Sequence, residues 1–170
     1  NTDSGGETAG ETANNAEPAK EPIVIKFSHV VVENTPKHQC AAKFKELLEE
    51  RSNGEFEVQI FPSSQLYGEK EELEALQANN VQFIAPLATR LIGFSPSFQI
   101  GDLPFLFKND QAVYNFFTGE YGEKMLMSLE DKGIIGMSWL LNANKQLANS
   151  KRPIKKPEDV KGLKLRTASG

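Results

Sequence analysis

The sequence predicts an α/β fold with a mainly parallel sheet, because strand-like and helix-like segments alternate along it. Residues 23–29 (IVIKFSH) and 81–85 (VQFIA) are β-rich, and residues 56–61 (FEVQIF) alternate strictly between apolar and polar. Helical patterns over 36–52 and 70–78 separate these three segments. A β-α-β-α-β order requires crossover connections, which place consecutive strands parallel.

The first predicted helix has a clear beginning and end. Thr35 suits the N-cap position and Pro36 the first helical position. Asn53 and Gly54 end the helix. Its apolar face is formed by residues at helical spacing, Cys40, Ala41, Phe44, Leu47 and Leu48.

The second predicted helix carries its apolar face on Leu73, Ala75 and Leu76. Four glutamates accompany it, Glu69, Glu71, Glu72 and Glu74. Such a group has two interpretations, either paired carboxylates for acid–base chemistry or the solvated face of a helix. We favour the solvated face, because Lys70 lies among the glutamates.

The chain after residue 85 is less regular. We expect the apolar stretch 103–107 to line the core, and helices over about 110–117 and 119–132. Residues 134–140 predict a further strand, and 145–148 and 163–166 two shorter ones. Between the last two, Pro157 begins a one-turn helix, which Gly162 ends.

Length and composition limit the protein class. The 170 residues suffice for one domain, or one and a part. A net charge of −4 argues against a dedicated nucleic-acid-binding protein but not against a small anionic ligand. The single cysteine, Cys40, excludes an internal disulfide. No apolar run approaches the roughly 20 residues of a membrane-spanning helix. Residues 1–22 are polar and predict a disordered tail.

Signs of catalysis are scarce. The chain has two histidines, no Gly-x-Ser-x-Gly motif and no phosphate-binding glycine loop. We therefore expect no catalytic residue, no metal site and no cofactor. His38 falls in the first turns of a helix, where we expect it to be solvated. His29 ends the first strand, and its sequence position leaves a ligand cleft and simple packing equally open.

Basic residues follow several predicted strands. Arg90 comes after the third strand, Lys145 after the segment of Trp139, and Arg166 at the end of the last strand. Parallel topology brings the carboxyl ends of strands to one edge, where α/β proteins bind ligands. Cations without acidic partners there would favour a small mono- or dicarboxylate, which an arginine grips with two hydrogen bonds. The alternative, ordinary surface charge, is the commoner case for any one of them.

Four stretches match one family in order and spacing. They are 26–31 with 34–36, 61–68 (FPSSQLYG), 101–107 (GDLPFLF) and 153–166. Over about residues 23–170 the chain resembles the extracytoplasmic solute-binding proteins of TRAP transporters, the DctP-like family. The resemblance implies a two-lobed α/β receptor with mainly parallel sheets, similar to type II periplasmic binding proteins, that closes on its ligand.

The resemblance also implies that the chain is only about the first half of such a receptor. Residues 1–22 would then be a tail or tether and 23–140 most of the N-terminal lobe. Residues 141–170 would be the crossover and the start of the C-terminal lobe. The tail fits the spacer of a lipoprotein with its lipid upstream of residue 1, and a free mature N-terminus is the alternative.

The resemblance assigns ligand-binding roles to individual residues. The family's arginine clamp for the ligand carboxylate falls at Arg166, and a second basic position falls at Lys145. The turn from Asn142 to Lys145, together with Arg90, resembles the C4-dicarboxylate branch. Leu87 and Ala143 depart from the family pattern, so sugar acids, sulfonates, keto acids and aromatic acids stay open.

The implied function is an extracytoplasmic receptor that delivers a small organic acid to the membrane permease subunits of a TRAP transporter. One alternative is a ligand-binding sensor that signals to a partner. A third and less favoured hypothesis is an enzyme that acts on a small carboxylate, because the sequence offers few nucleophile–base pairs.

Overall fold

The computed structural model describes residues 21–141 and 147–165. Its centre is a three-stranded parallel sheet in the order β2-β1-β3. β1 spans Ile23–Ser28, β2 spans Phe56–Phe61 and β3 is the short Phe83–Ile84. The predicted α/β class with a parallel sheet is confirmed, although the third strand is shorter than the sequence suggested.

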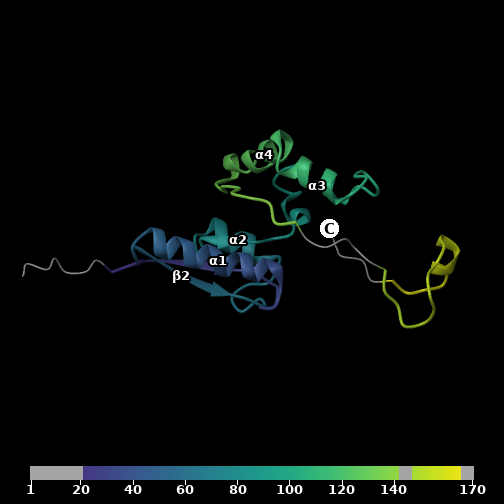
Figure 1. The fold of residues 1–170 in the computed structure, drawn as a ribbon, viewed down its shortest axis with the longest axis horizontal. Helices are drawn as coiled ribbons and strands as arrows, with labels where there is room; N and C mark the ends of the chain where they lie inside the picture. Colours follow the sequence, from purple (N-terminus) through teal and green to yellow (C-terminus); the bar gives the residue numbers. More distant parts are fainter. Residues whose placement is uncertain (1–20, 142–146, 166–170) are drawn as a thin grey trace, which may run out of the picture.

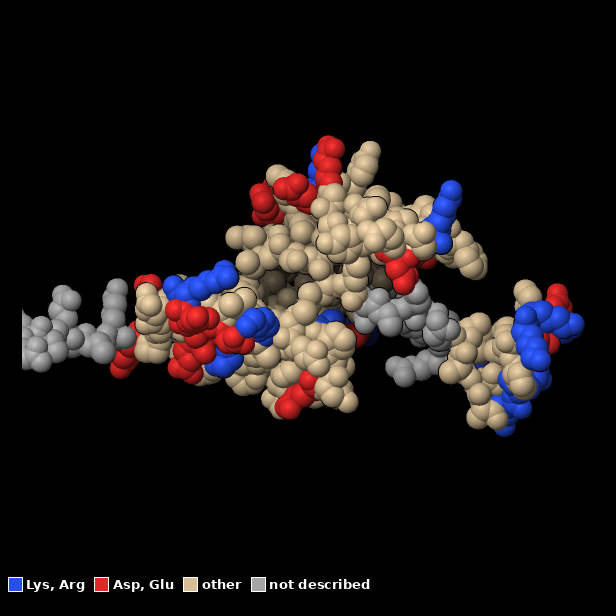
Figure 2. Space-filling model, viewed as in Figure 1, with Lys and Arg blue, Asp and Glu red and all other residues tan. Residues whose placement is uncertain are grey.

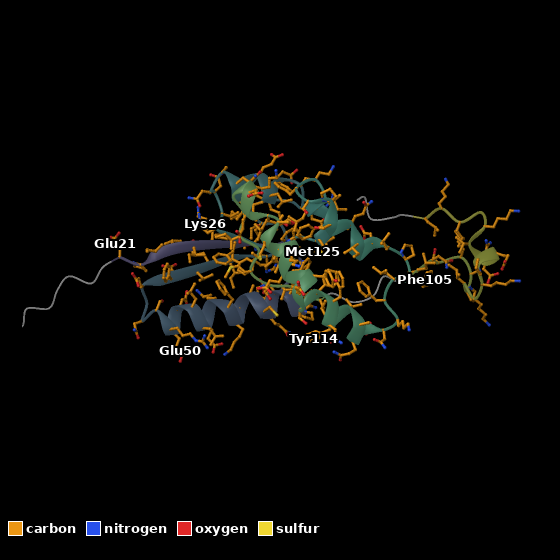
Figure 3. The ribbon with its side chains drawn as sticks, turned by 90° about the horizontal axis from the view of Figure 1, so that it is seen from above. Glu21, Lys26, Glu50, Phe105, Tyr114 and Met125 are labelled. Carbon is orange, nitrogen blue, oxygen red and sulfur yellow. The ribbon has the colours of Figure 1, made fainter. Side chains whose placement is uncertain are left out.

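Helices pack against both faces of this sheet. α1 (Pro36–Arg51) joins β1 to β2, and α2 (Glu71–Gln77) joins β2 to β3 (Figure 1). Adjacent residues of β3 point to opposite faces. Accordingly, Phe83 packs into the cluster under α1, whereas Ile84 packs into the cluster that holds Leu73 of α2. Figure 3 shows apolar side chains filling the space between α1 and the strands.

The predicted ends of α1 are confirmed. The Thr35 side chain accepts a hydrogen bond from the His38 backbone N–H at 3.4 Å, and Pro36 takes the first helical position. After the helix, Asn53 and Gly54 adopt left-handed backbone angles, with φ of 52° and 80°. Asparagine and glycine tolerate that conformation best, so the helix stops where the sequence predicted.

A second apolar cluster forms after β3. The chain passes through two 3₁₀ segments, η1 (Ala88–Leu91) and η2 (Pro96–Asp102), into α3 (Asp110–Phe117) and α4 (Glu120–Met127). A further 3₁₀ turn, η3, covers Glu130–Lys132. These elements surround a fully buried phenylalanine, and the buried members of the cluster are Leu73, Leu91, Phe98, Phe117, Met125, Leu129 and Ile134.

Two predictions for this region are wrong. Residues 134–140 are not a strand, because the structure, where it describes the chain, offers them no strand to pair with. They instead lie over the helices, where Trp139 packs on Phe98 and Phe117. The stretch 103–107 does not line the core either, since Phe105 is fully exposed and only Phe107 packs among the aromatic residues of α3.

Residues 147–165 form a local structure of their own, which lies away from the sheet in Figures 1 and 3. The predicted one-turn helix is confirmed as η4 (Pro157–Val160), followed by Gly162 with φ of 79°. Arg152 Nε donates to the Asp159 carbonyl at 3.0 Å. Residues 147, 148 and 163–165 are not strands. The remaining residues of those two predicted strands, 145, 146 and 166, lie outside the described residues.

Candidate functional site

Polar side chains gather at the carboxyl edge of the sheet, where β1 and β3 end. We call this group the edge cluster. It comprises residues of β1 and the loop after it, the first turn of α1, the start of α2, and η1. Its members are Ser28, His29, Lys37, His38, Glu69, Glu72 and Arg90.

The two histidines of the edge cluster contact each other. His29 Nε2 lies 3.1 Å from His38 Nδ1, and the His29 ring also packs edge-on against Phe27. His29 is fully buried. Burial lowers the pKa of His29, and the nearby charges of His38 and Lys37 lower it further. His29 thus packs inside the edge, and the expectation that His38 is solvated was wrong, because it is half-buried against His29.

Lys37 was not singled out from the sequence, yet it reaches across this edge. Its Nζ donates a 2.8 Å hydrogen bond to the carbonyl oxygen of Ala85, directly after β3. Burial lowers the pKa of Lys37, while the charges of Glu72 and Glu69 oppose that change. The sequence position of Lys37 could have indicated this role. The first turn of a helix that follows a parallel strand lies at the carboxyl edge of the sheet, where α/β proteins bind ligands.

Glu72 is fully buried, so its assignment to the solvated face of α2 was wrong. The helical period explains the error, because Glu72 lies one turn from Ala75, which is also buried. Neither carboxylate oxygen has a hydrogen-bond partner among the described residues. Burial raises the pKa of Glu72 to about 7, since the positive charge of Lys37 offsets desolvation only in part and Glu69 adds to the rise.

Arg90 has an acidic partner, which corrects the expectation of a cation without one. Its Nη2 donates to Glu69 Oε2 at 2.8 Å. The two side chains are only 18% and 33% exposed. Arg90 Nε is also buried and has no partner among the described residues. Because the guanidinium of an arginine has five N–H donors, an ion pair through Nη2 leaves other donors that can bind an oxyanion.

The edge cluster offers cationic groups that could bind an anion. It combines two cations with two carboxylates and a histidine pair, but within the described residues no three side chains are grouped to hold a metal ion. Three predicted site residues, Asn142, Lys145 and Arg166, lie outside the described residues. Their convergence with Arg90 stays a prediction.

Two other surfaces are apolar or exposed and do not gather buried polar groups as the edge cluster does. An apolar hollow of about 560 Å³ lies between η2 and the helices α3 and α4, lined by residues such as Ile100, Phe116 and Met125. Figure 2 shows lysines and arginines gathered on the segment 147–165. These basic residues are exposed, as expected for a solvated face. No helix in the described ranges is long and apolar enough to cross a bilayer.

Comparison with known proteins identifies the family. Residues 27–170 match the model of the DctP family, "bacterial extracellular solute-binding protein, family 7". The chain belongs to this family. The C4-dicarboxylate-binding periplasmic protein DctP of Shewanella loihica is 48% identical over 145 residues, which cover 85% of this chain and 43% of that protein.

Solved structures agree with this assignment. A TRAP periplasmic solute-binding protein from Shewanella oneidensis, with bound succinate, is 51% identical with a TM-score of 0.66, covering 69% of this chain and 38% of that one. Another from Sulfurospirillum deleyianum, also with bound succinate, is 36% identical with a TM-score of 0.79. It covers 84% of this chain and 46% of that one. The chain thus spans less than half the length of these DctP-family relatives.

Proposed function

We propose that these residues form the first part of a DctP-family receptor that binds a C4-dicarboxylate. The observation that carries the proposal is the pair of cations, Lys37 and Arg90, at the carboxyl edge of the parallel sheet. Relatives that are 51% and 36% identical to this chain hold succinate, a dicarboxylate.

The two ends of such a ligand require two cationic sites. In the proposal, Arg90 and Lys37 attract one carboxylate, and Arg166 clamps the other with two parallel hydrogen bonds. Lys145 and Asn142 add contacts near Arg166. His29 has a supporting role, because it is fully buried behind the edge. Each charge-assisted hydrogen bond would contribute about 1.5–3 kcal/mol.

The domain division follows from the same proposal. Residues 1–22 serve as a tail, 23–140 form most of the N-terminal lobe, and 141–170 begin the crossover to the C-terminal lobe. Lobe closure on the ligand is then a hinge motion.

The receptor works outside the cytoplasm and hands its ligand to membrane permease subunits, with a lipid upstream of residue 1 as an optional anchor. Its relatives are solute-binding proteins, and we propose that it has no catalytic activity of its own. Co-purification with a sensor kinase instead of a permease would favour the sensor alternative.

A thermal-shift panel on a protein of the relatives' full length, containing these 170 residues, tests the proposal. Succinate, malate or fumarate at about 100 times its Kd should add roughly 2.7 kcal/mol of stability. A melting shift with only a sugar acid such as galacturonate would support the receptor role but assign it a sugar acid instead of a C4-dicarboxylate. No shift with any of these acids would contradict the carboxylate site.

The clamp itself is tested by Arg166→Lys, which should weaken binding strongly, because lysine lacks the planar fork of the guanidinium. The matched control is Arg51→Lys, in the last turn of α1 and so at the other end of the sheet. Calorimetric titration that gave Arg166→Lys the affinity of the unchanged receptor would remove Arg166 from the site.

A further inference from the structure

Glu72 is a member of the edge cluster to which the proposed binding site gives no role. Glu72 is fully buried, and among the described residues neither of its oxygens receives a hydrogen bond. Leaving a buried carboxylate unpaired destabilises the fold, so a glutamate is an unfavourable choice at this position. A leucine or methionine of similar volume would avoid that destabilisation.

Charged groups face Glu72 from the surrounding elements. Lys37 of α1 and Glu69, just before α2, act on it electrostatically. Arg90 of η1 joins this network through its ion pair with Glu69. His29, after β1, and His38, on α1, are the histidines of this network, and the charge of Lys37 acts on His29.

The charge of this network depends on one proton. With both glutamates ionised, two carboxylates balance the two cations, Lys37 and Arg90. When Glu72 is protonated, the network gains one positive charge and Lys37 loses a compensating carboxylate. An arriving ligand dianion is then attracted more strongly, because charge interactions are large in a partly buried site.

We propose that Glu72 is a positioning residue that links the binding of a dicarboxylate to the uptake of one proton, acting through Lys37 and not through contact with the ligand. This inference rests on the proposed function. Linkage is reciprocal, so protonation of Glu72 strengthens ligand binding to the same extent that the ligand favours protonation.

The raised pKa of Glu72, about 7, supports the proposal, because both protonation states are then populated near neutral pH. A bound dianion at the edge would raise this pKa further by charge repulsion. Affinity should therefore fall as pH rises through the neutral range.

Calorimetric titration of the full-length receptor with fumarate tests the inference. Titrations run between about pH 6 and about pH 8.5, in pairs of buffers with different ionisation enthalpies, so that the heat counts the protons taken up. Fumarate serves as the probe because both its carboxyl groups are already ionised in this range. We expect uptake of up to one proton per ligand and a Kd that rises about tenfold across the range.

Glu72→Gln holds this position neutral. In that variant we expect no proton uptake, and an affinity that stays at the low-pH value of the unchanged receptor even at high pH. The matched control is Glu74→Gln, an exposed carboxylate on the same helix, which should keep the pH dependence.

The two histidines and Lys37, whose pKa burial lowers, are the competing sources of proton uptake. Uptake that persists in Glu72→Gln would assign the effect to Lys37, His29 or His38 and overturn the inference. His38→Asn gives a second readout if Glu72→Gln fails to fold, because the proton count should persist in it even where affinity changes, and its loss would likewise overturn the inference.

Two outcomes separate this inference from the proposed function. Fumarate binding that does not depend on pH overturns the inference alone. Binding of none of fumarate, succinate, malate and galacturonate at any pH overturns the proposed function, and the inference falls with it.

Discussion

Arg90 Nη2 lies 2.8 Å from Glu69 Oε2, and this ion pair ties η1 to the residues just before α2. Both side chains are mostly buried, so solvent screens their attraction less than in a typical surface ion pair. A ligand carboxylate that binds Arg90 must share or displace Glu69. In the proposed site, Glu69 would therefore compete with the ligand for Arg90.

Changing the two partners should have opposite effects on binding. Glu69→Gln removes the competing charge and should tighten dicarboxylate binding several-fold, whereas Arg90→Met should weaken it by about tenfold or more. Calorimetric titration of the full-length receptor measures both. The matched control is Glu71→Gln, an exposed carboxylate nearby, which should leave the affinity unchanged. Equal affinities in Glu69→Gln and Arg90→Met would contradict a ligand contact at Arg90.

Lys37→Met should reduce both stability and ligand affinity. It removes the 2.8 Å hydrogen bond to the Ala85 carbonyl and a positive charge beside Glu72. Loss of one partner of such a bond costs about 1–3 kcal/mol. Denaturant unfolding measures the stability change. Lys43→Met, exposed on the same helix, should change it little. If the two variants had equal stability, the bond across the sheet edge would have no structural importance.

The titration of Glu72 should make the free energy of unfolding depend on pH. Its pKa is raised from 4.5 to about 7, so between these values the folded state holds a proton that the unfolded state has released. Stability therefore falls as pH rises through this window. Glu72→Gln should remove that fall and gain on the order of 2–3 kcal/mol at pH 8. Chemical unfolding at about pH 5 and about pH 8 checks this. An equal fall in both proteins would place the titrating group elsewhere.

The sequence predicted those parts of the fold whose signals are local. The alternation of Phe56–Phe61 and the caps at Thr35 and Gly54 depend only on neighbouring residues, and each lies where expected. Residues 134–140 have an equally good strand pattern, but a strand requires a partner, and partners come from tertiary structure.

The candidate site was predictable only in part, for a similar reason. The position of Arg90 near the sheet edge followed from parallel topology, whereas its pairing with Glu69 depends on how the loop before α2 folds back. Glu72 was misassigned because a glutamate in a run of glutamates has the composition of a solvated face. Which glutamate is buried depends on how α2 is rotated against the sheet.

Gly122 of α4 lies too close to the backbone of α3 to carry a side chain. A Cβ at this position would overlap the Phe117 carbonyl oxygen, and the Gly122 carbonyl accepts the Trp139 indole N–H at 3.1 Å. Gly122→Ala must therefore push α4 away from α3 and loosen Trp139. We expect a loss of about 2 kcal/mol or more, typical of overpacking in a core. Thermal unfolding, with tryptophan fluorescence as the signal, measures this loss of stability.

The matched control for Gly122→Ala is Gly93→Ala, where an added Cβ meets no atom within 4 Å and stability should not change. Equal melting temperatures for the two variants would show that α3 and α4 tolerate a wider spacing than this packing implies.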